Sequence, residues 1–181
     1  DACMRNLIFE GWITFRMRAM LVSFASYNLW LDWRITGYHL AQTFTDYEPG
    51  IHYSQLQMQS GVTGINTVRI YNPIKQSYDH DPHGIFIKKW VPELKNISET
   101  WIHEPWKMEL STQRTTKCII GRNYPAPIVD HTISIKKARL RIAEIIKKDG
   151  YKDKSKVVLN KMGSRKRTKT SKNINPQLQL L

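Results

Sequence analysis

Apolar residues recur at helical spacing through the first part of the chain, and this pattern predicts a protein built from helices. Residues 2–10 have the pattern of a helix that ends at Gly11. Residues 13–34 are apolar around most of their circumference, so we expect one long helix there, central to the core. A third helix is expected from Tyr38 to Tyr47, stopped by the Pro-Gly pair that follows.

The middle of the chain gives weaker helical signals. The segment "QLQMQSGVTG" (55–64) fits a short helix or a loop, and "VRIYNP" (68–73) is too short and too isolated for a strand. A polar loop is expected over "KQSYDHDPHG" (75–84), followed by a helix through "IFIKKWVPEL" (85–94). Residues 95–130 are rich in Pro, Trp and turn formers, which predicts mostly irregular structure.

A basic amphipathic helix is predicted for "ISIKKARLRIAEIIKK", residues 133–148. Beyond Gly150 the chain has too little apolar content to order itself. The sequence shows neither an internal repeat nor a convincing alternation of strands. The predicted fold class is therefore all-α, with a helical domain over residues 1–146 and a basic, disordered tail over residues 147–181.

The formal charge of +13 belongs mainly to the end of the chain. Residues 1–135 hold 13 Lys or Arg against 12 Asp or Glu, a net charge of +1. Residues 136–172 hold 15 against 3, a net charge of +12. Two interpretations of this basic segment stay open: a solvated extension without a partner, or a segment attracted to nucleic-acid phosphates independently of sequence.

Cysteine content and hydropathy indicate the compartment. Cys3 and Cys118 are too few for a disulfide framework or a four-cysteine metal site, so we expect a reducing, cytoplasmic environment. The longest apolar run, residues 12–33, has the length of a membrane span but carries three charged side chains. It is predicted to be a buried helix, and no membrane partner is expected.

The stretch "TDYEPGIH" places two acids, Asp46 and Glu48, beside a helix end, where the carbonyl end of the dipole disfavours anions. Arg16 and Arg18 are similarly out of place in the apolar segment before them. We predict that Arg18 and one of the acids form a buried ion pair. The alternative is a salt bridge that is only structural and holds no ligand.

A metal site is a second interpretation of the acids and imidazoles in this half of the chain. Its candidate ligands are His39, Asp46, Glu48, His52, Asp79, His80, Asp81 and His83. They lack the fixed helical His spacing or Cys pairs that make a zinc assignment strong. We therefore favour a polar surface loop and predict no dedicated metal site.

Five sequence blocks resemble the cryptochrome/DNA photolyase family. They are "DACMRNLIFEGWITFRMRAMLVSFASYNLWLDWR", "DYEPGIHYSQLQMQSG", "RIYNPIKQSYDHDPHGIFIKKWVPEL", "IHEPW" and "YPAPIVDH", in the family's order and approximate spacing. The resemblance covers roughly residues 1–141 and implies the C-terminal part of a helical domain that binds FAD. It also implies that the chain is a piece of a longer protein, and we expect this piece alone to bind FAD weakly or not at all.

The resemblance assigns cofactor-binding roles by position. Arg18 matches the arginine that lies against the isoalloxazine and pairs with the first acid of a D-x-D motif, here Asp46. Glu48 stands at the second acid, with Tyr47 between them, and such carboxylates accept hydrogen bonds from the flavin ring and the ribityl chain. His52 stands where the family places the residue that faces flavin N5, commonly Asn, so an imidazole there would alter flavin protonation.

DNA contacts are implied at Arg16, Met17 and Gln76, which align with positions that touch a flipped lesion or its flanking phosphates. Three positions depart from the repair enzymes. They are Phe15 for Asn or His, Ala19 for Met or His, and Met58 for Trp. These departures put the lesion type, and repair itself, in question.

Electron supply departs from the family pattern as well. Trp33 matches the middle tryptophan of the photoreduction chain, but the position nearest the flavin is Leu56, whose saturated side chain cannot carry an electron. Tyr53 and Trp30 are the candidates for a detour.

The leading functional hypothesis is an FAD-dependent, light-driven DNA photolyase, a monomer whose partner is DNA containing pyrimidine dimers. In such an enzyme the excited reduced flavin donates an electron to the dimer, which splits and returns it. A cryptochrome-like photoreceptor without repair is the alternative, and Phe15, Ala19, Leu56 and Met58 favour it. A third hypothesis is a nucleic-acid-binding piece whose affinity resides in the basic tail.

Overall fold

The computed structural model describes residues 1–64 and 66–163, and over these residues it consists of helices and loops without a β-strand. The all-α prediction is confirmed. The α-helices are α1 (Ala2–Glu10), α2 (Phe15–Ser23), α3 (Trp33–Ala41), α4 (Pro49–Gln59), α5 (Pro73–His80), α6 (Ile85–Trp90), α7 (Leu110–Thr115), α8 (His131–Lys147) and α9 (Tyr151–Met162). A π-helical turn (Phe24–Asn28) extends α2, and short 3-10 turns lie at Pro92–Leu94 and Pro105–Lys107.

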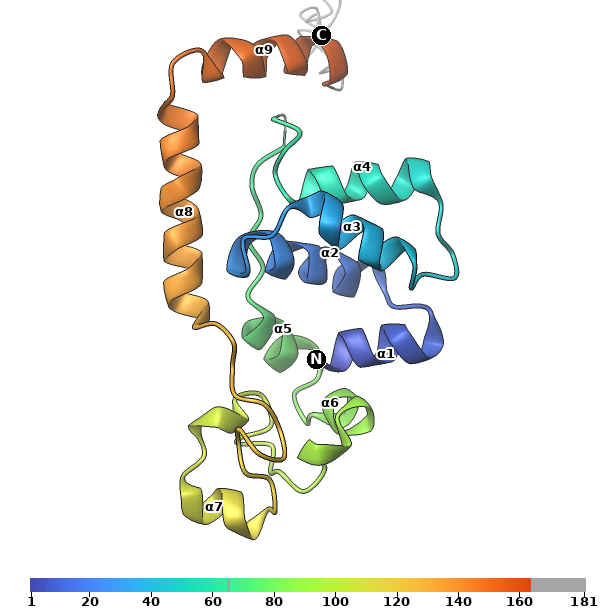
Figure 1. The fold of residues 1–181 in the computed structure, drawn as a ribbon, viewed down its shortest axis with the longest axis vertical. Helices are drawn as coiled ribbons and strands as arrows, with labels where there is room; N and C mark the ends of the chain where they lie inside the picture. The colour runs from blue at the N-terminus through green and yellow to red at the C-terminus, as the bar shows by residue number, and fades with distance from the viewer. Residues whose placement is uncertain (65, 164–181) are drawn as a thin grey trace, which may run out of the picture.

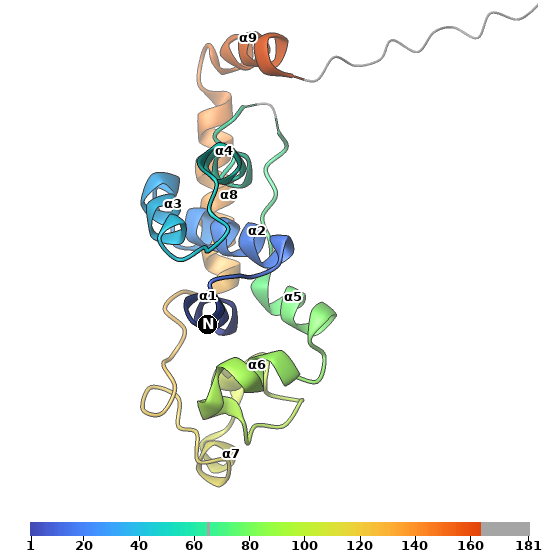
Figure 2. The ribbon, with the colours of Figure 1, turned by 90° about the vertical axis from the view of Figure 1, so that its right-hand side faces the viewer.

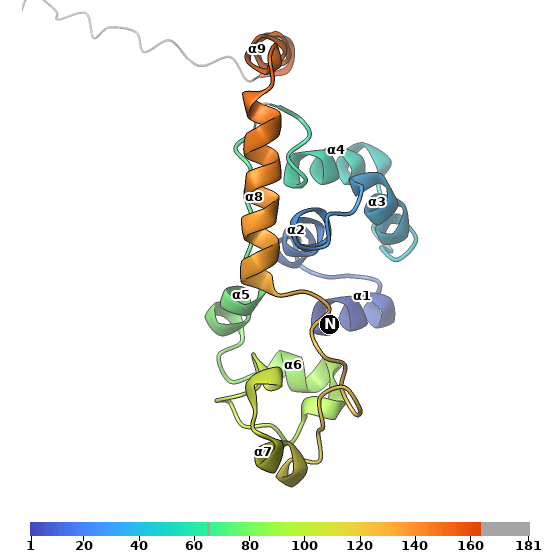
Figure 3. The same ribbon diagram turned by 60° about the vertical axis from the view of Figure 1, so that its left-hand side comes forward.

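The helices form an elongated body along which α8 runs (Figure 1). Helices α2, α3 and α4 pack together, α1 lies below α2, and α6 and α7 form the lower end (Figure 2). Turned by 60°, α8 comes forward and passes the ends of α2 and α4, and α9 lies across its upper end (Figure 3). Within the described residues, no helix is both long and apolar enough to span a lipid bilayer.

Three apolar clusters hold the body together. The first joins α1 to α4 through Leu7, Ile13, Val22, Leu40, Phe44 and Leu56. A second cluster lies under α6, at Val91, Leu94, Ile97, Ile102, Met108 and Cys118. In the third, Tyr27 packs against Ile135 and Ala138 of α8. A bidentate Arg5–Glu93 pair, at 2.8 and 2.9 Å, links the first two clusters.

The single helix expected over residues 13–34 is wrong, because the chain leaves the helical path between Asn28 and Trp33. Helix α2 continues as a π-helical turn in which Leu29 N–H bonds Phe24 O at 3.1 Å. Trp30 then takes a left-handed φ of 55°, which ends the helix. Asp32 starts α3 as its N-cap and accepts from Arg34 N–H at 2.9 Å.

The third helix also ends earlier than expected. Helix α3 stops at Ala41, so Asp46 and Tyr47 lie in a loop. Pro49 does not stop a helix but occupies the first turn of α4, where its missing N–H is not needed. The expected clash between the acids and a helix C-terminus is therefore wrong, because Glu48 stands at a helix N-terminus, where an anion is favoured.

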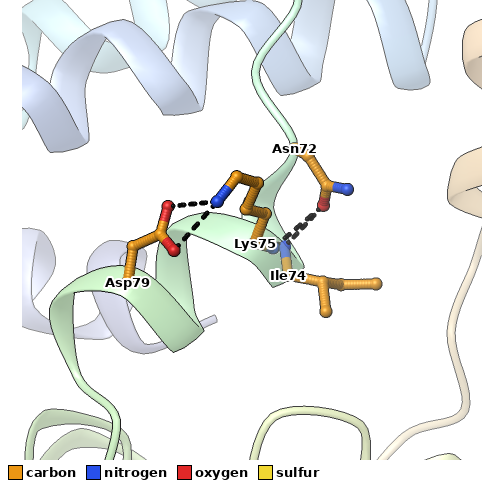
Figure 4. Close-up of polar contacts among 4 residues, drawn as sticks. All are labelled: Asn72, Ile74, Lys75 and Asp79. Carbon is orange, nitrogen blue, oxygen red and sulfur yellow. Dashed lines mark hydrogen bonds and ion pairs between the residues drawn. The ribbon is translucent and has the colours of Figure 1, made fainter.

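The polar segment at residues 75–84 is largely helical rather than a loop. Asn72 caps α5 by accepting from Ile74 and Lys75 N–H, and Lys75 pairs with Asp79 one turn later at 2.8 Å (Figure 4). The segment between α5 and α6 is a tight turn, and the Asp81 carboxylate accepts from two N–H groups of α6, at 2.9 and 3.0 Å. The acids of this segment are thus used as caps and surface pairs.

The C-terminal part matches one prediction and contradicts another. The basic helix expected over residues 133–148 is confirmed as α8, and residues 95–130 are irregular apart from α7 and a short 3-10 turn. Beyond Gly150, however, the chain forms α9 instead of lacking order. This helix carries exposed Lys side chains and only a few apolar ones, and Ser155 Oγ–H anchors it by donating to Gly64 O at 2.9 Å. Residues 164–181 of the predicted disordered tail lie outside the described residues, and the boundary at residue 146 remains a prediction.

Candidate functional site

Arg18 and Asp46 form the ion pair that the sequence predicts, with Nη2 of Arg18 2.8 Å from Oδ2 of Asp46. Helix α2 supplies the arginine and the α3–α4 loop the acid. The Arg18 guanidinium is held further by Nε donation to Ile13 O at 3.0 Å and by the Phe44 ring, 4.1 Å away. Three contacts therefore fix the orientation of this cation.

The pair is not buried, contrary to expectation. The Arg18 side chain is 24% exposed and that of Asp46 is 47% exposed, because the pair forms the rim of a cavity instead of lying under the core. The hydrogen bond from Arg18 lowers the pKa of Asp46 below its ordinary value, and the charge of the guanidinium adds to this. Asp46 is thus an anion that accepts hydrogen bonds at neutral pH.

Glu48 and Tyr47 complete the loop. Oε2 of Glu48 accepts from Ile51 N–H at 2.6 Å, which caps α4 and fixes the carboxylate in place. Tyr47 is 40% exposed, and the neighbouring Tyr53 hydroxyl raises the pKa of its phenol. All three acidic and phenolic groups of this loop therefore point toward the same cavity, which they line.

His52 lies in the first turn of α4 and joins it to α3. Its Nε2–H donates to Gly37 O at 2.9 Å, which leaves Nδ1 as an acceptor in the neutral ring. The ring meets Tyr47 and Phe44 edge to face, with centroids 5.3 and 5.9 Å away. His52 is half-buried and lines the cavity, so its predicted place in the site is consistent with the structure.

The cavity has a volume of about 170 Å³, with an apolar floor and a polar rim. Ala19, Val22, Leu40 and Leu56 form the floor. Sequence reasoning missed Gln55 and Gln59, which follow His52 along the same face of α4 at helical spacing; that spacing was the signal that could have identified them. Gln55 lines the cavity, and its Oε1 is buried without a hydrogen-bond partner among the described residues, so this amide has an acceptor that the described chain does not satisfy.

These features fit one edge of the isoalloxazine ring of FAD, which the resemblance implies. The ring is flat and apolar on its faces and carries an N–H donor and carbonyl acceptors along one edge. The Gln55 and Asp46 oxygens supply acceptors, the Arg18 guanidinium supplies donors, and the floor supplies apolar contact. The volume is below the usual range of about 300–1,000 Å³ for complete ligand pockets, so these residues cover only part of the cofactor.

A second, larger cavity of about 680 Å³ contains the three residues predicted to contact DNA. Arg16 and Met17 reach it from α2 and Gln76 from α5. Arg16 is exposed, and Oε1 of Gln76 is buried without a partner among the described residues. Arg16 and Arg18 therefore serve different cavities, although they are two residues apart.

Trp33 is connected to the smaller cavity by aromatic side chains. Its ring centroid is 6.5 Å from that of Tyr53, which lies 5.1 Å from His52 and 6.4 Å from Tyr47. Leu56 is fully buried beneath the cavity, as its alignment with the flavin-proximal position suggests. Trp30 is in no aromatic pair of the described residues; instead the Arg141 guanidinium lies 4.8 Å from its ring.

The residues considered for a metal site serve other purposes. Asp79 pairs with Lys75, and His83 lies 3.0 Å from Glu99 at the surface. Over residues 1–64 and 66–163, no cluster of three His, Cys, Asp or Glu side chains has a geometry suited to a metal ion.

The departures from the repair pattern lie in or beside the smaller cavity. Phe15 and Ala19 line it, and Phe15 is 59% exposed at the mouth. Met58 is half-buried on α4 and does not line either cavity. Phe15 makes the mouth of the cavity, and Ala19 makes its floor, more apolar than an amide or imidazole would.

Comparison with known proteins agrees with this site. The family model described as the FAD binding domain of DNA photolyase matches residues 1–144. A deoxyribodipyrimidine photo-lyase from Alkalihalophilus pseudofirmus is 38% identical over 140 residues, which is 76% of this chain and 29% of that protein. Cryptochrome-1 from Aedes aegypti is 31% identical over 134 residues, 72% of this chain and 25% of that protein.

The fold has solved counterparts as well. The crystal structure of a bacterial class III photolyase from Agrobacterium tumefaciens superimposes with a TM-score of 0.75 at 28% identity, covering 81% of this chain and 31% of that one. The chain thus spans less than a third of the length of the relatives it matches. On the match over residues 1–144, the chain belongs to the photolyase/cryptochrome family, in the FAD-binding domain of that family.

Proposed function

We propose that this chain supplies one wall of the FAD site of a light-driven DNA photolyase. The observation that carries the proposal is the cavity rim, where the fixed Arg18–Asp46 pair and the unpartnered Gln55 oxygen stand above an apolar floor. When bound, FAD supplies light-driven one-electron transfer. The residues of the chain bind and orient the ring, and the closely packed floor excludes water from it.

Each residue has a role that its contacts suggest. Asp46 accepts hydrogen bonds from the ring edge and stays ionised because of Arg18. Glu48 caps α4 and so orients the loop that carries Asp46 and Tyr47. Its carboxylate would also contact the ribityl chain directly. His52 presents Nδ1 as an acceptor because Nε2–H is engaged with Gly37 O.

For the substrate we propose DNA that contains a pyrimidine dimer, entering through the larger cavity. Its volume of about 680 Å³ falls within the usual range for ligand pockets, about 300–1,000 Å³. Arg16, which is exposed, would contact a phosphate beside the flipped dimer, and Gln76 would line the cavity that receives it. Trp33, through Tyr53, would carry electrons to the flavin from the protein surface. We propose a cytoplasmic monomer.

A cryptochrome-like photoreceptor is the second candidate, favoured by the apolar Phe15 at the mouth of the cavity and Ala19 in its floor. The relatives include proteins named as photo-lyases and as cryptochromes.

One assay separates the two candidates. The complete protein that contains this chain is loaded with FAD and mixed with ultraviolet-irradiated DNA, and dimers are counted after blue light and after darkness. We expect dimers to be lost only in the light. Flavin binding without a light-dependent loss of dimers would contradict the photolyase proposal and support the photoreceptor. Absence of flavin binding would contradict both proposals.

A further inference from the structure

The outward surface of α8 and α9 carries a concentration of positive charge. Residues 131–163 hold 10 Lys or Arg against 3 Asp or Glu, a net charge of +7, whereas residues 1–130 hold 13 against 12. We propose that this surface, which we call the α8–α9 face, binds the phosphate backbone of duplex DNA independently of sequence and lesion. The name covers all the exposed Lys and Arg side chains of residues 131–163, which are spread around the solvent-facing sides of the two helices: Lys136, Lys137, Arg139, Arg141, Lys147, Lys148, Lys152, Lys154, Lys156 and Lys161.

Ion pairs are rarer on this face than in the rest of the described chain, where 5 of the 13 Lys and Arg side chains of residues 1–130 contact a carboxylate and 8 do not. Elsewhere, five Lys or Arg side chains contact a carboxylate at 2.7–2.9 Å, namely Arg5, Arg18, Arg34, Lys75 and Lys107. On the α8–α9 face the described residues contain a single ion pair, Lys156–Asp153, at 4.0 Å. The other cations of this face repel one another and gain by the approach of an external polyanion.

Helix α8 is fixed to the body, so its cations are held in place around the solvent-facing sides of one helix. Ile135 and Ala138 are buried against Tyr27, and Nδ2 of Asn28 donates to His131 Nδ1 and to Ser134 Oγ, both at 2.9 Å. Lys136 and Lys148 are separated by about 18 Å along the helix axis, at a rise of about 1.5 Å per residue. Figures 1 and 3 show this helix along one side of the body, with no other helix over its outward surface.

Trp30 and Arg141 extend the face beyond the helix. The guanidinium lies 4.8 Å from the indole ring, and the Trp30 side chain is held outward, 39% exposed, by its left-handed backbone at φ 55°. Stacking on an aromatic ring leaves the edge N–H groups of an arginine free, and these donate to phosphate oxygens in a fixed orientation. A lysine in the same place could offer only a point charge.

Duplex DNA fits this face better than a membrane surface does. A helix that lies in a membrane needs a continuous apolar face. Ile133 and Leu140 share one stripe of α8 with Lys136, Lys137 and Glu144, which interrupt it. The other exposed apolar residues do not extend this stripe, because Ile145 and Ile146 lie on other sides of α8, and Val157, Leu159 and Met162 of α9 are interspersed with lysines. The continuous apolar face of α8 is already packed against Tyr27.

The proposed binding does not use the flavin, and it rests on the proposed function only in the choice of DNA as the polyanion. It would hold the protein on undamaged DNA between encounters with a lesion. Binding of the cations releases counterions from the DNA phosphates, so the affinity should fall steeply as the salt concentration rises.

The test measures fluorescence anisotropy of a short, undamaged, labelled duplex in darkness at several salt concentrations. The complete protein is compared with Lys136→Glu/Lys137→Glu/Arg139→Glu and with a control triple, Lys95→Glu/Arg114→Glu/Arg122→Glu. Both triples change the net charge by the same amount, and the control positions are exposed. Any contribution of the residues after 163 is common to all three proteins.

We expect the α8 triple to weaken binding at least tenfold and to reduce the slope of log K against log salt by about 3, which is about 0.9 for each lost phosphate contact. The control triple should weaken binding less than about threefold, through long-range charge alone. Equal losses in the two triples would overturn the proposal. So would binding to vesicles of anionic phospholipid in preference to the duplex.

Two further variants guard against misfolding and test the stack. Replacing the same three α8 residues by Gln keeps their helix propensity and removes only the charge, so it should reproduce the loss. Arg141→Lys keeps the charge but removes the planar group, and it should weaken duplex binding about two- to fivefold. Two results together would show that the α8–α9 face is not a DNA site. They are duplex binding by Arg141→Lys equal to that of the parent, and equal binding by the Gln triple when its circular dichroism spectrum is unchanged.

Discussion

The cavity at Arg18 and the α8–α9 face use charge in opposite ways. At the cavity, a cation is fixed by a carboxylate, a carbonyl and an aromatic ring, and the group left without a partner is the neutral oxygen of Gln55. On the α8–α9 face, nearly all of the cations lack a carboxylate partner among the described residues. Paired charge on an apolar floor suits a neutral, flat ligand with a polar edge, whereas unpaired charge along a helix suits an extended polyanion.

The aromatic chain belongs to the cavity and gives the largest expected effect on a rate. Trp33→Phe in the complete protein should slow light-driven reduction of bound flavin by about tenfold or more, equivalent to about 1.4 kcal/mol of barrier, because phenylalanine is much harder to oxidise. Transient absorption after a light flash measures the rate, and the absorption of a tryptophan radical should disappear with it. The control is Trp30→Phe, which alters the α8–α9 face and should leave the rate unchanged. An equal slowing by both would mean that the two regions are not separate.

Arg18 should contribute more to stability than an arginine with an exposed pair. Arg18→Ala removes the contacts to Asp46, Ile13 O and Phe44, and should lower the free energy of unfolding by about 2–3 kcal/mol. Arg34→Ala removes a pair whose arginine side chain is 73% exposed, and should have little effect. Urea unfolding of the two variants measures the difference, and equal values would contradict the account of a fixed cavity rim.

Asn28 is the attachment of the α8–α9 face to the body. It is 6% exposed, and Asn28→Ala leaves His131 Nδ1 and Ser134 Oγ without their donor, so unfolding should cost about 1–3 kcal/mol less. Asn66→Ala, at an exposed position with a hydrogen bond of 3.4 Å to Thr63, is the control and should change little. The backbone amides of α8 should exchange hydrogen faster in Asn28→Ala than in the parent. Unchanged exchange rates in α8 would mean that apolar packing alone holds this helix to the body.

The same contact gives a smaller, pH-dependent effect. Burial lowers the pKa of His131 below its ordinary value of 6.5, with Asp130 opposing this. The unfolded chain therefore takes up a proton more readily than the folded one, so the stability contributed by neutral His131 is present above pH 6.5 and is lost as pH falls below it. We expect a loss below about 1.4 kcal/mol, the value of one pKa unit. Unfolding measured on both sides of that pH should show a smaller pH dependence in His131→Gln; an identical dependence would assign it elsewhere.

The sequence was sufficient to predict features that follow from local pattern. Helix α1 and its Gly11 end, and the amphipathic α8, were predictable because apolar spacing and a left-handed cap act within one segment. An ion pair between Arg18 and one of the two acids was predictable because a cation in an apolar segment favours an anion beside it, and the family resemblance identified Asp46 as the partner, 28 residues away.

Features that depend on the path of a loop were not predictable in the same way. The role of Glu48 as a helix cap requires α3 to end at Ala41, six residues earlier than apolar spacing suggested. Gln55 looked like an ordinary polar helix position, because only the fold shows that its oxygen is buried without a partner. The break at Trp30 was hidden by an apolar run that continues across it.

The claim that the cavity and the α8–α9 face are separate sites is tested most directly by FAD titration of two variants of the complete protein. Asp46→Asn keeps the shape of the side chain but removes the charged acceptor, and its FAD affinity should fall about tenfold or more, since hydrogen bonds to charged groups contribute about 1.5–3 kcal/mol. The Lys136→Glu/Lys137→Glu/Arg139→Glu protein should bind FAD with unchanged affinity. Equal affinity of Asp46→Asn and the parent, or an equal loss in both variants, would contradict the account.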